Sequence, residues 1–328
     1  MRVLMRSLAA ALVASITVVL GACAGNQPPV KIGLITKQET NPYWVTMREV
    51  AEDTARKAGA TLITATGTGD VDVQSQRAAL QDMVSQGVDG ILIAPADSTG
   101  LAPDIEAARA KGITVIALDT PMKPVETTDA YFGTDNQRAG ELVGEYARAK
   151  IKEAGKPPRV VMLNLAPGIT SGEERAAGFQ KGFQLTDDVL AAAVDSEGDQ
   201  ELARQQMAAT VAEHPDINVV YAVNEPAALG AIDAMRAAGM NMDDVVVVTV
   251  DGGCVAMREA VRPGTIDATA MQFPQNMARQ GVTAIVSKVR DGQAPSGYLA
   301  TGTELVSGSP APGVASKNVE FGIRTCWG

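Results

Sequence analysis

The sequence predicts an α/β protein built from two doubly wound lobes, each with its own parallel sheet. Short apolar runs rich in β-branched residues alternate with longer amphipathic segments along residues 30–272. Several of these segments are followed by a glycine, which is typical of the left-handed residue that ends a helix: Gly59, Gly87, Gly112 and Gly239. Strict alternation of strand and helix indicates parallel strands joined by right-handed crossovers.

The apolar runs predict ten strands, at residues 30–36, 61–66, 90–95, 114–118, 130–133, 159–165, 191–194, 219–223, 245–250 and 265–272. The amphipathic segments predict helices that include residues 44–58, 73–86, 101–111, 137–154, 172–184, 200–214, 227–238 and 254–262. A fully apolar run such as residues 245–248 is what a strand covered on both faces needs.

Two stretches of the chain share one order of elements. Residues 81–120 and 205–252 each run as helix, strand, helix ending at glycine, and strand ending at aspartate. In both stretches a proline lies near the end of the first strand, at Pro95 and Pro226. This internal repeat supports two similar lobes.

The N-terminus predicts export. Arg2 and Arg6 precede an apolar run over residues 7–21, which is typical of a secretory signal peptide and predicts one at residues 1–22. The run ends in Leu20-Gly21-Ala22-Cys23, which resembles a bacterial lipobox and implies a lipidated Cys23 followed by a tether over residues 23–29. The protein is then expected on the outer face of the cell membrane, or in the periplasm. The alternative is cleavage by ordinary signal peptidase with Cys23 incidental.

Composition agrees with an exported globular protein. The 328 residues carry 38 acidic and 28 basic side chains, and 46% are hydrophobic, enough for about two domains. An acidic chain without a basic cluster argues against nucleic acid as a partner. Cys254 and Cys326 remain as an even pair, which predicts one disulfide in an oxidising compartment. The alternative is two buried free thiols.

Polar and aromatic side chains gather just past the predicted strand ends, where open parallel sheets bind their ligands. These candidates are Lys37, Asn41, Tyr43, Trp44, Asp119, Arg175 (in the loop after residues 159–165), Asn224, Asp251 and Gln272. Carboxylates, amides and a guanidinium supply the directional hydrogen bonds that a neutral, hydroxyl-rich ligand requires, and the rings suit its C–H face. Each has an ordinary structural alternative: a helix cap or turn for Asp119, Asp251 and Asn224, core for Trp44, and a surface ion pair for Arg175.

Six stretches of the chain resemble the ribose-binding, type I periplasmic sugar-binding family: residues 40–44, 113–119, 174–179, 222–225, 250–253 and 271–274. The resemblance implies sugar-contacting roles for Asn41, Tyr43, Trp44, Asp119, Arg175, Asn224, Asp251 and Gln272. Two departures alter that pattern. Thr120, a further candidate contact, stands where ribose binders carry arginine, and Gly198 replaces an aromatic residue. A sugar alcohol and an aldose are therefore both expected ligands.

The resemblance also implies lobe boundaries and partners. One lobe would hold residues 30–134 and 273–302, and the other residues 135–272 and 303–328, with three chain crossings as the hinge. Both cysteines then fall in one lobe. The implied protein is a monomer that delivers its ligand to an ABC permease, without a cofactor, a metal or catalytic residues.

Three rival functions remain for comparison. A polyol dehydrogenase using NAD would need a glycine fingerprint, but Gly67-Thr68-Gly69 has Asp72 at the third glycine position and follows the second strand. A sugar-responsive repressor would need a basic DNA-binding segment ahead of Val30, where a signal sequence lies instead. A receptor that serves a chemoreceptor, or one for a quorum signal, stays open.

Overall fold

Two six-stranded sheets form the framework of the computed structural model, which describes residues 28–328. The predicted signal peptide and Cys23 lie outside these residues. The first sheet has the order β11-β5-β4-β3-β1-β2 and the second β12-β10-β9-β8-β6-β7. Their strands are β1 (Lys31–Thr36), β2 (Thr61–Thr66), β3 (Gly90–Ile93), β4 (Thr114–Leu118), β5 (Ala130–Gly133), β6 (Val160–Asn164), β7 (Leu190–Asp195), β8 (Val219–Ala222), β9 (Val246–Asp251), β10 (Ala268–Met271), β11 (Gly297–Ala300) and β12 (Glu304–Ser307).

Helices cover both faces of each sheet. The helices of the first lobe are α1 (Pro42–Lys57), α2 (Val73–Ser85), α3 (Ala102–Ala110) and α9 (Pro274–Asp291). Those of the second are α4 (Asn136–Glu153), α5 (Thr170–Phe183), α6 (Gln200–Glu213), α7 (Glu225–Ala237), α8 (Cys254–Ala256) and α10 (Val319–Thr325). The short helical turns are η1 (Val125–Thr127), η2 (Met242–Asp244) and the π-helical η3 (Met257–Val261). Separate apolar clusters fill the two faces of each sheet, so the predicted α/β fold with two lobes is confirmed.

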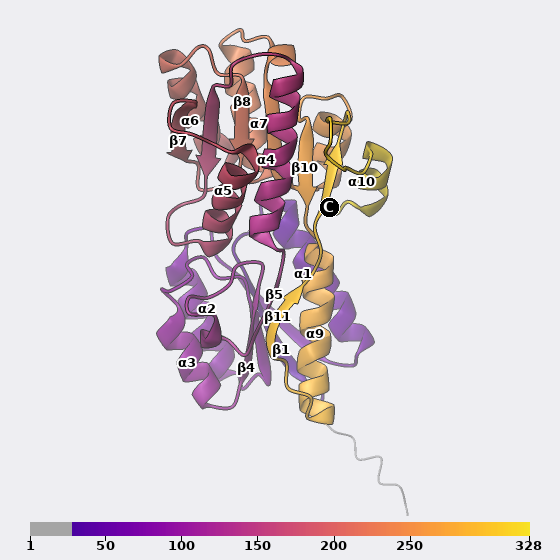
Figure 1. The fold of residues 1–328 in the computed structure, drawn as a ribbon. Coiled ribbons are helices and arrows are strands. Elements are labelled where there is room, and N and C mark those ends of the chain that lie inside the picture. The colour runs from indigo at the N-terminus through magenta and orange to yellow at the C-terminus, as the bar shows by residue number, and fades with distance from the viewer. Residues whose placement is uncertain (1–27) are drawn as a thin grey trace, which may run out of the picture.

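The chain passes between the two sheets three times. It crosses after β5, after β10 and between β11 and β12. Figure 1 shows the result: α9 and β11, which come late in the sequence, lie in the same lobe as β1 and β4. The carboxyl ends of the parallel strands in each lobe point toward the other lobe, which places the predicted site residues between them.

The predicted strand pattern misses the last two strands. β11 (Gly-Tyr-Leu-Ala) and β12 (Glu-Leu-Val-Ser) lie beyond residue 272, and each has only four residues, which gives a sequence pattern little to detect. β11 pairs with β5 in parallel, whereas β12 pairs with β10 antiparallel and is the exception to the parallel arrangement. Both are short strands at the edge of a sheet, which accounts for the weak signal.

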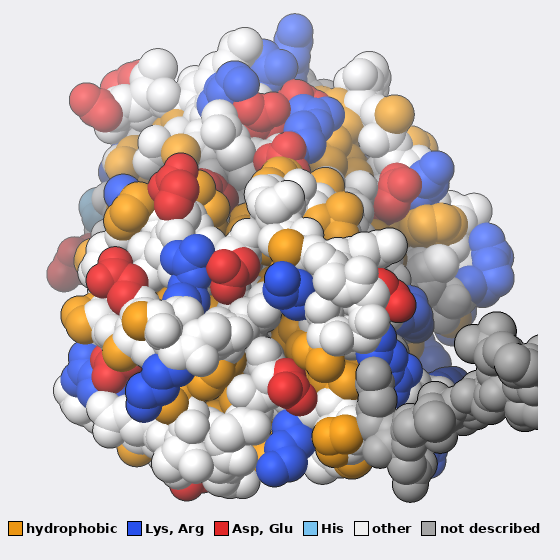
Figure 2. Space-filling view, turned by 90° about the horizontal axis from the view of Figure 1, so that it is seen from below, with side chains coloured by type: hydrophobic (Ala, Val, Ile, Leu, Met, Phe, Trp, Pro, Cys, Tyr) orange, Lys and Arg blue, Asp and Glu red, His pale blue; other side chains and the backbone are white. Residues whose placement is uncertain are grey.

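No membrane-spanning helix occurs among residues 28–328: none is both long enough and apolar enough. The end of the first lobe that is seen in Figure 2 mixes acidic and basic side chains with scattered apolar ones and has no concentration of basic groups.

The C-terminal tail is fastened to both lobes. A disulfide joins Cys254 to Cys326, with the two Cα atoms 4.9 Å apart, as the sequence predicts. The next residue, Trp327, donates its indole N–H to the carbonyl of Gln272 at 2.9 Å. Its ring also meets Tyr43 edge-on, with the ring centroids 5.2 Å apart. The disulfide therefore anchors a tail that packs against a candidate site residue and a chain crossing.

We predict that the disulfide stabilises the exported protein. Replacing Cys254 and Cys326 together by alanine should lower the free energy of unfolding by about 2–4 kcal/mol, because the bridge closes a long loop in the unfolded chain. Urea titration measures the change. Mass spectrometry that finds two free thiols in protein exported under oxidising conditions would contradict the assignment.

Candidate functional site

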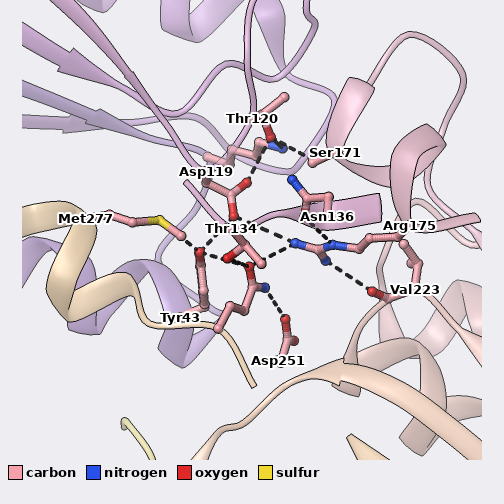
Figure 3. Close-up of polar contacts among 12 residues, drawn as sticks. Tyr43, Asp119, Thr120, Thr134, Asn136, Ser171, Arg175, Val223, Asp251 and Met277 are labelled. Carbon is pink, nitrogen blue, oxygen red and sulfur yellow. Dashed lines mark hydrogen bonds and ion pairs between the residues drawn. The ribbon is translucent and has the colours of Figure 1, made fainter. Parts of the chain in front are cut away.

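Ten side chains predicted from the sequence as ligand contacts converge where the two lobes meet. Lys37, Asp119 and Gln272 each follow a strand directly, Asp251 is the last residue of β9, and Asn224 lies two residues past β8. Figure 3 shows Tyr43, Asp119 and Thr120 from the first lobe facing Arg175 and Asp251 from the second. The strand-end argument thus brings together residues far apart in the chain.

Arg175 lies at the centre of the cluster. It lies in the second turn of α5, within the helix predicted over residues 172–184, and not in the loop that follows residues 159–165. Its Nε donates to Asn136 at 2.8 Å, Nη1 to the carbonyl of Val223 at 3.1 Å, and Nη2 to Gln272 at 3.0 Å. The guanidinium is buried and also faces Asp119 of the opposite lobe at 3.9 Å, so it is not a surface ion pair.

Asp119 receives hydrogen bonds from its own lobe. The hydroxyl of Tyr43 donates to Oδ1 at 2.7 Å and that of Thr120 to Oδ2 at 2.8 Å. Asp119 has a backbone φ of +63° and Asp251 a backbone φ of +149°. Residues other than glycine rarely adopt positive φ values of this kind. Such strain concentrates at functional sites, where the surrounding structure enforces it.

Asp251 is held by the hinge and by α7. Gln272 donates from Nε2 to Oδ1 at 2.7 Å, and the backbone N–H of Glu225 donates to Oδ2 at 3.1 Å. Glu225, which the sequence analysis did not select, turns its carboxyl away to accept from the backbone N–H groups of Gly252 and Gly253, both at 2.9 Å. Two buried carboxyl groups therefore lie beside each other.

Thr120 makes a second contact between the lobes, and Lys37 is bonded to it. Thr120 Oγ1 lies 2.9 Å from the hydroxyl of Ser171, which belongs to α5 of the second lobe. Lys37 Nζ donates to the same Thr120 Oγ1 at 3.3 Å and lies 5.5 Å from the centroid of the Trp44 ring. Ser171 is a site residue that sequence reasoning missed, because a serine near the start of a helix commonly serves only the backbone.

Two asparagines serve the backbone as well as the site. Asn41 Oδ1 accepts from the N–H of Tyr43 at 2.9 Å and caps α1, and Asn224 Oδ1 accepts from Ala227 at 3.0 Å and caps α7. Asn224 also donates to the carbonyl of Gly198 at 3.0 Å. The structural alternative given for Asn224 is therefore present, and Asn41 also caps a helix, while both side chains line the cavity.

Asp70 is the most informative residue missed from the sequence. It lines the cavity from the loop after β2, and its carboxylate accepts from Gln38 at 2.8 Å. In the sequence, this loop stands out only because Gly67-Thr68-Gly69 does not complete a dinucleotide fingerprint. Its place beyond a strand end was the signal that could have found it.

The space among these residues is small. The cavity measures about 20 Å³, close to the room that one water molecule needs. A hollow on the flank of the lobe interface, which we call the flank hollow, measures about 380 Å³ and is lined by residues that include Pro42, Leu229, Val255 and Trp327. Asn41 and Asp251 border both spaces. A sugar would require the lobes to separate before it could enter the cavity.

Burial shapes the protonation of the cluster. It raises the pKa of Asp251 to about 6, against the opposing effect of Arg175, and raises the pKa of Glu225 well above its usual value. The pKa of Tyr43 is raised by burial and by Asp119, so its hydroxyl stays protonated and donates. Burial alone would lower the pKa of Arg175, but Asp119 and Asp251 more than offset this and the pKa is raised.

Comparison with known proteins identifies the family of this chain. Residues 32–294 match the family described as periplasmic binding protein domain. The chain belongs to this family. A D-ribose/D-allose-binding protein of Pseudomonas aeruginosa is 30% identical over 84% of this chain and 88% of its own length.

Solved structures of the family agree with the fold. A solute-binding protein of Actinobacillus succinogenes with bound D-allose has a TM-score of 0.76 and 27% identity, covering 85% of this chain and 98% of that one. One of Mycobacterium smegmatis with bound glycerol has a TM-score of 0.77 and 27% identity, covering 92% and 99%. The family resemblance predicted from the motifs is confirmed.

The raised pKa of Asp251 predicts a pH-dependent stability difference. The folded protein holds this proton more tightly than the unfolded chain, so wild type loses stability as pH rises from about 4 to about 7. Asp251→Asn lacks this titration, and its stability relative to wild type should rise over that range by up to about 3 kcal/mol.

Chemical denaturation at a series of pH values measures this difference. Asp187→Asn, at an exposed position, serves as the control and should follow wild type throughout. If the free energies of unfolding of wild type and Asp251→Asn change with pH in the same way, burial does not destabilise the charged form of Asp251.

Proposed function

We propose that this chain is the extracytoplasmic solute-binding protein of an ABC importer and captures a small sugar or sugar alcohol between its lobes. One observation carries the proposal. Asp119, Arg175, Asp251 and Gln272 come from strand ends or helices of both lobes and form one buried hydrogen-bonded cluster at the lobe interface. Such a cluster can exchange its internal hydrogen bonds for bonds to ligand hydroxyls when the lobes close.

The charges of the cavity favour a neutral ligand. Three carboxyl groups, Asp70, Asp119 and Asp251, line it together with two cations, Lys37 and Arg175. An anionic ligand would meet the carboxylates, and a cationic one would meet Arg175 at the centre. Hydroxyl groups both donate and accept, so they can satisfy carboxylates and the guanidinium at once.

The aromatic contacts favour a ligand packed on one face. Both rings that line the cavity, Tyr43 and Trp44, belong to the first lobe. Gly198 supplies no ring, and its φ of +72° disfavours a side chain at this position of the second lobe. Without a ring from the second lobe, a flat pyranose has no special advantage over a flexible alditol, and both ligand classes stay in the proposal.

Binding would couple to lobe closure. Hinge closure around a ligand is the established motion of periplasmic binding proteins. The contact between Thr120 and Ser171 and that between Ser98 and Gly168 join the lobes in the present conformation. A permease that recognises a surface made by both lobes would distinguish the closed form. A chemoreceptor could use the same form and remains the alternative partner, and the protein itself would act as a monomer.

We further propose export and lipid anchoring, which rest on the sequence of residues 1–23 alone. The two solved structures named above are solute-binding proteins of ABC transporters, and the proposed role as the binding protein of an importer requires a place outside the cytoplasmic membrane. Cys23 would hold the mature protein at the outer face of that membrane through its lipid chains.

The cavity assignment predicts a strong effect of the two aspartates on affinity. Asp119→Ala and Asp251→Ala should each weaken binding by roughly tenfold to a hundredfold, because hydrogen bonds to ionised groups contribute roughly 1.5–3 kcal/mol. Titration calorimetry measures this with the tightest ligand from a panel of D-ribose, D-allose, D-arabinose, glycerol, erythritol, ribitol and xylitol.

His214→Ala is the control, because His214 lies at the end of α6 and contacts Arg159 rather than the cavity. Its affinity should equal that of wild type. If both aspartate variants stay folded and bind like wild type, the cavity is not the ligand site.

Membrane fractionation tests the anchor. Cys23→Ala should move the protein from the membrane pellet to the soluble fraction, because the variant has no thiol to acylate. The Cys254 and Cys326 double variant is the matched control and should stay in the pellet. A Cys23→Ala protein that remains in the membrane would refute the lipobox.

A further inference from the structure

One end of the cavity holds three polar groups whose hydrogen-bonding capacity is poorly used: the ammonium of Lys37, the indole N–H of Trp44 and the carboxylate of Asp70. All three side chains are buried, with exposed fractions of 1%, 4% and 8%. A buried polar group without a partner costs roughly 1–3 kcal/mol, so a folded protein seldom leaves hydrogen-bonding capacity unused at three neighbouring buried groups without a use for it.

Lys37 is the first of these. Its ammonium offers three donors, yet among the described residues it makes a single hydrogen bond, the 3.3 Å contact with Thr120. It is also attracted to the face of the Trp44 ring, 5.5 Å away, and to Asp70, where its charge opposes the rise in pKa that burial causes. At least one N–H of Lys37 is left to bind an acceptor in the cavity.

Trp44 supplies a second donor. Its Nε1 is buried and has no hydrogen-bond partner of normal geometry anywhere in the described part of the chain. The same indole lies close enough to Asp70 to act against the burial that raises the pKa of that carboxyl. The N–H and the carboxylate therefore share one region of the cavity. The sequence alone predicts only an apolar face for Trp44.

Asp70 supplies the acceptor. An ionised carboxylate has about four acceptor sites, and Gln38 uses one of them at 2.8 Å. Asp70 Oδ2 also lies 3.4 Å from the point where a Cβ atom on Gly198 of the other lobe would stand. Asp70 thus reaches the boundary between the lobes, where a ligand held by both would lie.

We propose that Lys37, Trp44 and Asp70 form a subsite for a vicinal diol, which we call the diol subsite. Two adjacent hydroxyls match it: one can donate to Asp70 while both accept from Lys37 and Trp44 Nε1. A carboxylate or phosphate has no proton to give Asp70 and would be repelled by it. An ether or methylated oxygen also lacks that proton.

The diol subsite rests on the proposed function and narrows its substrate class. It selects neutral sugars or alditols that carry an unsubstituted pair of adjacent hydroxyls, and it discriminates against sugar acids and phosphorylated sugars. The hydrogen bonds of Lys37 and Asp70 go to Thr120 and Gln38 rather than to Arg175 or Asp251, so a substitution in the subsite leaves the hydrogen bonds of those two residues with Gln272 in place.

A protein–ligand double cycle tests the subsite. Titration calorimetry compares wild type and Asp70→Asn with D-ribose, xylitol and their monodeoxy analogues. For the ligand that binds, the affinity should fall roughly tenfold or more when Asp70 is replaced by Asn, and by a similar factor when the ligand lacks the recognised hydroxyl. When both changes are made together, the loss of affinity should be no larger than for either change alone. Trp44→Phe keeps an aromatic ring but removes the N–H. It should weaken binding of the parent ligand roughly threefold to tenfold, and it should not further weaken binding of the analogue that lacks the recognised hydroxyl.

Glu39→Gln is the matched control, because it removes a nearby negative charge that faces Arg48 outside the cavity. Its affinities should equal those of wild type. Two outcomes would overturn the diol subsite while the binding function stands. In one, Asp70→Asn and Trp44→Phe weaken binding of the parent ligand and of every analogue equally. In the other, neither substitution weakens binding at all. If Asp70→Asn fails to fold, the Trp44→Phe cycle decides alone. Failure of wild type to bind any ligand of the earlier panel or this one would instead overturn the proposed function, and the subsite with it.

Discussion

The buried guanidinium of Arg175 is the constraint on which the rest of the site depends. A cation in the interior is tolerated only when it is hydrogen-bonded and balanced, and Arg175 finds Asn136, Val223 and Gln272 as acceptors, with Asp119 and Asp251 as counter-charges. These partners come from the first lobe, the second lobe and a crossing between them. One side chain therefore fixes the positions of residues that lie far apart in the chain, and replacing any one of its partners leaves the buried guanidinium with one hydrogen bond or one counter-charge fewer.

The same arrangement makes the site costly for the fold and suited to a ligand. Asp119 and Asp251 adopt backbone conformations that favour glycine, and Asp251 lies beside the buried carboxyl of Glu225. The surrounding sheets supply the stability that holds these groups in place, since both faces of each sheet are covered by apolar clusters. A neutral ligand with many hydroxyls can relieve the crowding by bonding to several of these groups at once.

Much of the fold and the core of the site could be predicted from the sequence. Buried parallel strands appear in it as apolar runs, and their carboxyl ends meet at one edge of the sheet. Asp119, Asp251 and Gln272 follow from that rule alone. Arg175 was found too, although its helix begins earlier than expected. The rule fails for β11, whose residues are all exposed. It covers Asp70, which lies beyond the end of β2, but the loop that holds Asp70 resembles an ordinary glycine turn. It also cannot reveal that Asn41 and Asn224 cap helices, because the same side chain serves a cap and a cavity equally well.

A crystal structure of the protein with the tightest ligand of the panel tests the central claim most directly. We expect the ligand between the lobes, with its oxygens about 2.6–3.2 Å from Asp119, Arg175 and Asp251 and its C–H face on Trp44. The contacts that Arg175 and Gln272 now make with each other would be replaced in part by contacts with the ligand. A ligand found in the flank hollow beside Leu229 and Val255, with the Arg175 cluster unchanged, would contradict the account.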